Sequence, residues 1–126
     1  MSELVLTIAD HIIAKGMITK REDTVGRIVD YIRININNEI NADILARELF
    51  LSKNSIYSAI KNEFGMTLGQ YIQVARLDKA SQMLLTTDKS IMEISEQCGI
   101  DDFNYFSRLF RKNFGLSPTT YRKKFA

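Results

Sequence analysis

The chain has 126 residues and a formal net charge of +2, with 45% apolar and 25% charged residues. These values are ordinary for a globular protein and exclude a disordered chain. No apolar run approaches the roughly 18 residues that span a bilayer, and residues 4–9 lack the flanks of a signal peptide, so we predict a cytoplasmic protein without membrane contact.

Apolar side chains recur at helical spacing along nearly the whole chain, and the only proline is Pro118, so we predict an all-α protein. The first predicted helix covers residues 3–15 and is closed by Gly16. A second covers residues 24–36 and ends at Asn37. Both carry their apolar residues on one face, as a helix packed on a core does.

The middle of the chain predicts two short helices and one long one. Asn41 can cap a helix that ends near Phe50, and Ser52 can cap another that stops at Gly65. The long helix, over about 67–86, has apolar residues on more than one side and must therefore be covered on two sides. We expect it to connect two small units.

The last part of the chain repeats the pattern of a short helix followed by a longer one. Ser90 caps the short helix, with Glu93 at the spacing of a capping box. The next helix begins at Asp102 and is closed by Gly115, and Ser117 starts the final helix. The side chains expected on the inner face of the helix after Asp102 are Phe103, Phe106, Phe110 and Phe114.

The two halves of the chain align when the numbering is shifted by 50. Helix caps, apolar residues, basic residues, glycine stops and tyrosines match in the pairs Ile44/Ile94, Ser52/Asp102, Ile56/Phe106, Ile60/Phe110, Lys61/Arg111, Phe64/Phe114, Gly65/Gly115, Thr67/Ser117 and Tyr71/Tyr121. Such a repeat indicates one supersecondary unit used twice. A short helix, a tight turn and a longer helix form a helix-turn-helix unit, predicted here over about 42–65 and 90–115. The second turn contains Gly99, whereas the first has Phe50 and no glycine.

Basic residues gather at the end of the chain. From Phe103 onward there is no acidic residue, and the basic ones are Arg108, Arg111, Lys112, Arg122, Lys123 and Lys124. This pattern is typical of a surface that binds a polyanion, although a solvated basic helix would look the same.

The sequence contains few residues or motifs that would support catalysis or metal binding. The single cysteine, Cys98, and the single histidine, His11, exclude an internal disulfide and a cysteine metal cluster. A glycine-rich phosphate loop is also missing. We expect no enzyme activity, metal or cofactor, a buried Cys98 and a surface-exposed His11.

A long motif runs through the second unit. It reads Ser90-Ile91-x-Glu93-Ile94-Ser95, Gly99-Ile100-x-Asp102, Tyr105-Phe106-Ser107-Arg108-x-Phe110-Arg111-Lys112 and Gly115-x-Ser117-Pro118-x-x-Tyr121-Arg122, and the long helix before it carries Arg76, Leu77, Ala80 and Leu84. With these residues the chain resembles, over about 23–126, the DNA-binding domain of the AraC/XylS family of bacterial transcription regulators.

The resemblance implies two helix-turn-helix units joined by a rigid helix, seven helices in all, that bind two adjacent major-groove segments of double-stranded DNA. It implies a transcription regulator that activates, with RNA polymerase as a further partner. Residues 1–22 would then form a leading helix and linker outside the domain 23–126. Because family members often carry an N-terminal sensor domain, residues 3–15 could join such a domain, contact a dimer partner or cap the first unit.

Candidate DNA contacts follow from the outward faces of the two longer helices, since a recognition helix reads base edges near its N-terminus. The candidates for base contacts are Asn54, Tyr57, Ser58, Asn104, Tyr105, Ser107 and Arg108. Arg108 suits guanine, and the two asparagines suit adenine. The candidates for phosphate contacts are Ser52, Lys53, Lys61, Ser90, Arg111, Lys112 and Ser117.

Other interpretations remain for these residues. Polar side chains on an outer helix face are usually only solvated, and Arg76 could be an inward partner of a carboxylate. The alternative function is a helical protein-interaction module without DNA binding, which would lack the steep salt dependence of phosphate contacts.

Overall fold

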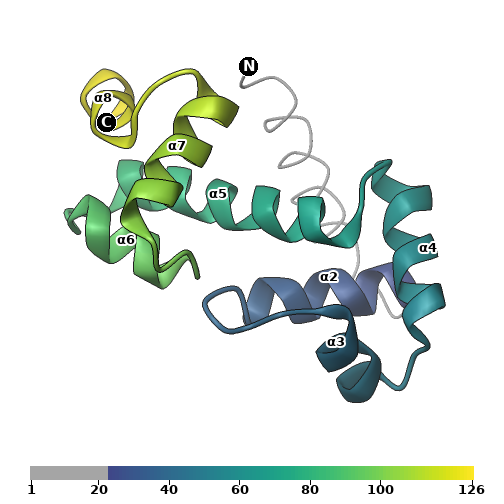
Figure 1. Cartoon of the computed structure of the whole chain (residues 1–126). Coiled ribbons are helices and arrows are strands. Elements are labelled where there is room, and N and C mark those ends of the chain that lie inside the picture. The colour runs from purple at the N-terminus through teal and green to yellow at the C-terminus, as the bar shows by residue number, and fades with distance from the viewer. Residues whose placement is uncertain (1–22) are drawn as a thin grey trace.

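The computed structural model describes residues 23–126, and all regular secondary structure in that range is helical (Figure 1). The seven helices within it are α2 (Thr24–Ile34), α3 (Ala42–Leu49), α4 (Lys53–Phe64), α5 (Leu68–Thr86), α6 (Ile91–Gln97), α7 (Phe103–Phe114) and α8 (Pro118–Phe125). The all-α prediction is confirmed. The helix predicted over 3–15, with His11, lies outside the described residues.

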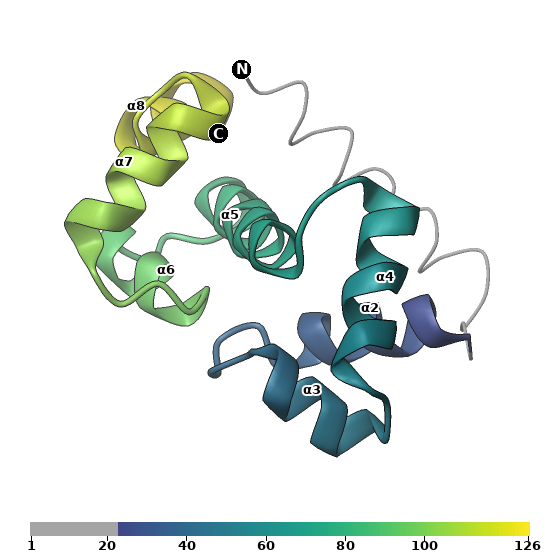
Figure 2. The same cartoon turned by 45° about the vertical axis from the view of Figure 1, so that its right-hand side comes forward.

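Helix α5 runs between two groups of helices. In Figures 1 and 2, α2, α3 and α4 lie at its beginning, and α6, α7 and α8 lie at its end. It packs on α4 in the first group and on α6 and α8 in the second. Its buried residues include Tyr71, Leu77, Ala80 and Leu84, which point to more than one side. The prediction of a connecting helix covered on two sides is confirmed.

Local capping explains where most helices begin. The predicted caps Asn41, Ser52, Thr67, Ser90, Asp102 and Ser117 each accept a hydrogen bond from a backbone N–H of the following turn. Thr67 and Ser90 form reciprocal capping boxes, the second with Glu93 as predicted. Gly65 and Gly115 end α4 and α7 in the left-handed conformation, at φ 72° and 80°.

The repeat is visible in the core. Ile56 and Ile60 of α4 are fully buried, and so are their counterparts Phe106 and Phe110 of α7. Ring contacts repeat as well, since Phe64 lies against Tyr71 at 4.6 Å between centroids and Phe114 lies against Tyr121 at 5.4 Å. Phe103, the first residue of α7, was expected among the core residues but is only partly buried.

The alignment of the shorter helices needs a correction. The cap Asn41 corresponds to Ser90, and the fully buried Leu45 corresponds to Ile94, so Ile44 was the wrong partner for Ile94. These pairs differ by 49 in number, because one more residue lies between Gly99 and the cap Asp102 than between Phe50 and the cap Ser52. The shift of 50 holds from the longer helices onward.

The turn of the first unit contains a strained residue. Phe50, at φ 56°, occupies the left-handed position that Gly99, at φ 89°, occupies in the second turn. Its side chain is 91% exposed, so burial does not compensate for the strain. A glycine could adopt this conformation without a steric penalty.

Phe50→Gly is therefore expected to stabilise the protein by about 0.5–1 kcal/mol. Relief of left-handed strain contributes about 1–2 kcal/mol, and the greater freedom of glycine in the unfolded chain offsets part of it. Thermal unfolding followed by circular dichroism measures the change. Phe50→Ala is the control, because it removes the ring and keeps the strain. A Phe50→Gly protein that melts below Phe50→Ala would contradict the prediction.

Candidate nucleic-acid interface

The two predicted recognition helices are α4 and α7, and each has one buried face and one exposed polar face. On α4 the exposed predicted contacts are Lys53, Asn54, Tyr57, Ser58 and Lys61; on α7 they are Asn104, Tyr105, Arg108, Arg111 and Lys112. Ser107 is partly buried and is the least accessible predicted base contact. The outward orientation inferred from the sequence is therefore correct for α4 and for most of α7.

A small cluster organises the exposed face of α7. The Gln73 Nε2 on α5 donates a hydrogen bond of 3.2 Å to the Tyr105 hydroxyl. The Arg108 guanidinium lies over the Tyr105 ring, 5.8 Å from its centroid, as in a cation–π contact. The Tyr105 ring restrains Arg108 through this contact. Tyr105 is itself 43% exposed, so its ring remains accessible to a ligand. Gln73 was missed from the sequence, because its link to Tyr105 joins two helices 32 residues apart.

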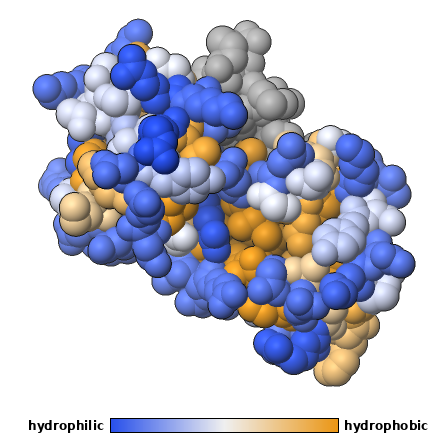
Figure 3. Space-filling model, viewed as in Figure 1, coloured by the Kyte–Doolittle hydropathy of each residue, from blue (hydrophilic) through white to orange (hydrophobic). Residues whose placement is uncertain are grey.

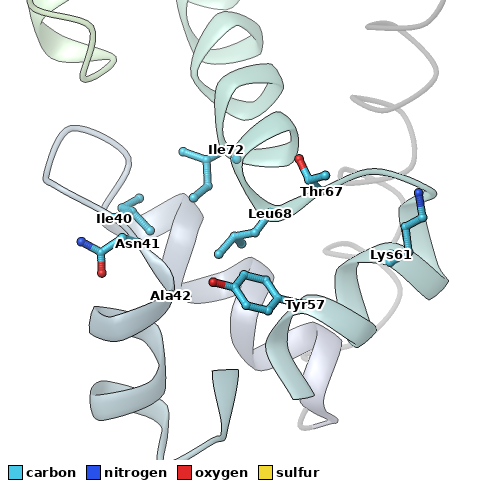
Figure 4. Close-up of a pocket in the computed structure, with 9 residues that line it drawn as sticks. Ile40, Asn41, Ala42, Tyr57, Lys61, Thr67, Leu68 and Ile72 are labelled. Carbon is cyan, nitrogen blue, oxygen red and sulfur yellow. The ribbon is translucent and has the colours of Figure 1, made fainter. Parts of the chain in front are cut away.

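Tyr57 on α4 borders an apolar cleft where α3, α4 and α5 meet. The cleft has a volume of about 560 Å³ and is lined by Ile40, Asn41, Ala42, Tyr57, Lys61, Thr67, Leu68, Gly69 and Ile72. Figure 3 shows an apolar hollow over these helices, and Figure 4 shows the Tyr57 ring turned toward Leu68, with the Lys61 ammonium directed away. Tyr57 is 49% exposed, so this end of α4 presents an apolar surface beside polar groups. Such a surface suits a thymine methyl group.

Lys53, a predicted phosphate contact, is already paired. Its Nζ lies 3.0 Å from Oδ1 of Asp43 on α3, and the hydrogen bond to this carboxylate raises the pKa of Lys53. Both side chains are largely exposed. A phosphate would therefore compete with Asp43 for the ammonium.

Asp43→Asn is expected to strengthen binding to duplex DNA by roughly two- to five-fold at low salt, the range that exposed ion pairs contribute. The substitution frees Lys53 and removes a carboxylate that would repel phosphate. Fluorescence anisotropy with a labelled duplex at two salt concentrations measures the change. Glu48→Gln on the same helix is the matched control and should have a smaller effect. Unchanged or weaker binding by Asp43→Asn would contradict the competition.

Within residues 23–126, three arginines donate hydrogen bonds to backbone carbonyls of other elements. Arg122 on α8 donates to the carbonyls of Leu84, Thr87 and Lys89 at 2.8–3.1 Å. It thus holds the end of α5 and the loop before α6. Arg27 on α2 donates to the Leu49 carbonyl at the end of α3. The inclusion of Arg122 in a polyanion-binding patch was wrong, because its guanidinium is occupied inside the fold.

Arg76 on α5 is the third of these arginines. Its Nε donates to the Ile36 carbonyl at 3.2 Å, and one terminal nitrogen donates to the Asn38 carbonyl at 2.7 Å. Burial lowers its pKa. The inward orientation predicted for Arg76 is correct, but the predicted carboxylate partner is wrong, since the acceptors are carbonyl oxygens.

The predicted serine contacts are also occupied. The hydroxyls of Ser52, Ser90 and Ser117 accept bonds from their own helices. Those of Ser52 and Ser117 also donate, to Ser55 and Thr120. Phosphate binding at these helix starts would therefore use backbone N–H groups.

Among residues 23–126, no cluster of histidine, cysteine and acidic side chains could hold a metal ion. In the same range, no helix has the length and apolar character to cross a membrane. Cys98 is fully buried, as predicted, and burial raises its pKa to about 11.

Comparison with known proteins agrees with this geometry. A family model described as a helix-turn-helix domain matches residues 45–124. The HTH-type transcriptional activator RhaR from Mannheimia succiniciproducens is 36% identical over 91 residues, which are 72% of this chain and 33% of that protein. The C-terminal domain of AraT, a response regulator from Geobacillus stearothermophilus, superimposes with a TM-score of 0.76 at 31% identity, covering 84% of this chain and 88% of that one.

An AraC-type DNA-binding domain protein from Chromobacterium violaceum gives the same TM-score of 0.76 at 27% identity, with 81% of this chain and 91% of that one covered. The chain belongs to the AraC family of DNA-binding transcription regulators. This membership confirms the resemblance read from the motif in the second unit, and the family consists of regulators rather than enzymes. The chain spans about a third of the length of the curated AraC-family relatives it matches.

Proposed function

We propose that this chain binds a specific double-stranded DNA sequence, with α4 and α7 in two adjacent major-groove segments. The observation that carries the proposal is the duplicated pair of helices on α5, each with a packed apolar face and an exposed face of amide, phenol and basic groups. A helix of this kind fits the major groove, where its side chains can distinguish all four base pairs.

The proposed division of labour follows from position and chemistry. Base contacts come from Asn54, Tyr57, Ser58, Asn104, Tyr105, Ser107 and Arg108. Phosphate contacts come from Lys53, Lys61, Arg111 and Lys112, and from the backbone N–H groups at Ser52, Ser90 and Ser117. Arg108 is the strongest single candidate, because its fork can bind guanine O6 and N7 and its contact with Tyr105 restrains it beforehand.

The domain organisation we propose places the DNA-binding domain at 23–126, with helix-turn-helix units at about 42–65 and 90–115 and the connecting helix at about 67–86. Residues 1–22 would form the leading helix and linker outside this domain. We propose that the whole protein is a cytoplasmic transcriptional activator that contacts RNA polymerase. The similarity to RhaR, which is named as a transcriptional activator, supports the activating role.

The experiment is selection of bound sequences from a pool of random DNA duplexes, followed by affinity measurements on the selected site. Arg108→Ala is expected to lose about 5- to 150-fold in affinity, equal to about 1–3 kcal/mol, and to relax specificity at one base pair. Lys112→Ala should instead weaken binding to all sequences and reduce the salt slope by about one. A pool that yields no enriched sequence would overturn the proposal and favour a protein-interaction module.

A further inference from the structure

The turn of the second helix-turn-helix unit touches the loop that precedes the first unit, away from the recognition faces. Gly99, in the turn between α6 and α7, lies against Ile36, in the loop between α2 and α3. A Cβ atom at Gly99 would be 2.5 Å from the Ile36 carbonyl oxygen and 2.8 Å from Nε of Arg76. The second turn, the loop between α2 and α3 and the middle of α5 therefore meet at one point.

Arg76 occupies the centre of this junction. It donates from two different nitrogens to the carbonyls of Ile36 and Asn38, so its guanidinium fixes the loop in two directions. These two carbonyls belong to the loop, because α2 already ends at Ile34 with Asn35 as its cap. The guanidinium also lies beside Gly99, since a Cβ atom there would be 3.1 Å from Cζ of Arg76.

We propose that Arg76 is a positioning residue that fixes the orientation of one helix-turn-helix unit relative to the other. If helix α5 were the only connection between the two units, it could bend and twist at a low cost in free energy, and the angle between the units would vary. The contact through Arg76 adds a second connection away from the α4–α5 and α5–α6 packing. The inference rests on the proposed function in one respect: the fixed orientation would set which spacing of two groove segments the protein accepts.

The first test measures orientation without DNA. Spin labels are placed at Asn62→Cys on α4 and Lys112→Cys on α7, two exposed positions, and the distance distribution is measured by double electron–electron resonance in the complete chain. Cys98 is fully buried and should not label, which the unsubstituted chain checks. Arg76→Met is expected to widen the distribution by at least roughly twofold, because the second connection is lost.

Arg122→Met is the matched control, because Arg122 also donates to backbone carbonyls, but only at the end of α5 and in the loop before α6, away from the α2–α3 loop. It should lower the melting temperature and leave the distance distribution narrow. Arg76→Lys is a second variant, to be used if Arg76→Met does not fold. A single ammonium cannot reproduce the two hydrogen bonds that the guanidinium donates in different directions, so a wider distance distribution is expected for this variant too. A distribution for folded Arg76 variants as narrow as the original would overturn the proposal.

The second test uses the DNA site obtained by selection and the same site with one base pair inserted between its two segments. The preference for the selected spacing is expected to fall at least roughly five-fold in Arg76→Met and to persist in Arg122→Met, since only the first variant frees the angle between recognition helices. An unchanged preference in Arg76→Met would contradict the role in spacing. If selection recovers no DNA sequence, the proposed function fails, while the label distances still decide whether Arg76 fixes the orientation.

Discussion

Phe110→Ala is expected to lower the free energy of unfolding by about 3–5 kcal/mol, the usual loss when a buried phenylalanine is truncated. Phe110 is fully buried. Its ring centroid lies 4.3 Å from that of Phe114, 5.3 Å from that of Tyr121 and 5.9 Å from that of Phe106. Alanine would leave a cavity at the centre of this ring cluster. Because domains are stable by only about 5–15 kcal/mol, much of the second unit's stability would be lost.

Urea denaturation of the complete chain, followed by circular dichroism, measures this loss. Ile60→Ala is the matched control, because Ile60 is the fully buried counterpart of Phe110 in the first unit and loses fewer carbon atoms on truncation. Ile60→Ala is expected to lower the free energy of unfolding by about 2–5 kcal/mol, a range that begins below the one expected for Phe110→Ala. DNA affinity should fall with either change, since each loosens the packed face of a recognition helix. A Phe110→Ala protein within about 1 kcal/mol of the original would show that the ring cluster is not the core of the second unit.

The features that the sequence predicted well are local ones. A cap such as Ser90 and the glutamate three residues later act within one helical turn, so their spacing is sufficient to place the start of α6. The same holds for Gly65 and Gly115, which end helices by their own backbone conformation. Apolar spacing placed the buried faces of α4 and α7, and the exposed candidate contacts followed by exclusion.

The features that the sequence did not predict depend on residues far apart in the chain. The helix expected over 24–36 ends at Ile34, and the carbonyls of the following loop bind Arg76, 38 to 40 residues away. Arg122 looks like part of a basic surface until its carbonyl partners, 33 to 38 residues earlier, are known. The pairing of Tyr105 with Gln73 is of the same kind. Helical periodicity describes which face is buried and carries no information about such pairs.

The turn of the first unit shows a different limit. Local patterns favour glycine where the backbone is left-handed, yet Phe50 holds that conformation in α3's last turn. Without a glycine as a marker in this turn, the shift of 50 was carried back through it, and Ile44 was aligned in place of Leu45.

Gly99→Ala is expected to be far more damaging than the same change at the other left-handed glycines. At φ 89° an alanine would be strained by about 1–2 kcal/mol. Its Cβ would also meet the Ile36 carbonyl oxygen at 2.5 Å, a backbone atom of another element that cannot swing aside. Overpacking of this kind costs about 1–3 kcal/mol, so the total expected loss is about 2–5 kcal/mol.

Gly65→Ala and Gly115→Ala separate the cost of backbone strain from the cost of the Cβ clash. Both glycines have a positive φ, but nothing lies within 4 Å of a Cβ built on either. Each substitution should therefore cost only the backbone strain, about 1–2 kcal/mol. Thermal and urea unfolding of the three variants measures the difference. Gly99 lies where the turn of the second unit meets the α2–α3 loop, so the extra stability lost at Gly99 measures how rigid this contact is. Equal losses of stability at all three glycines would mean that the loop around Ile36 moves aside without cost.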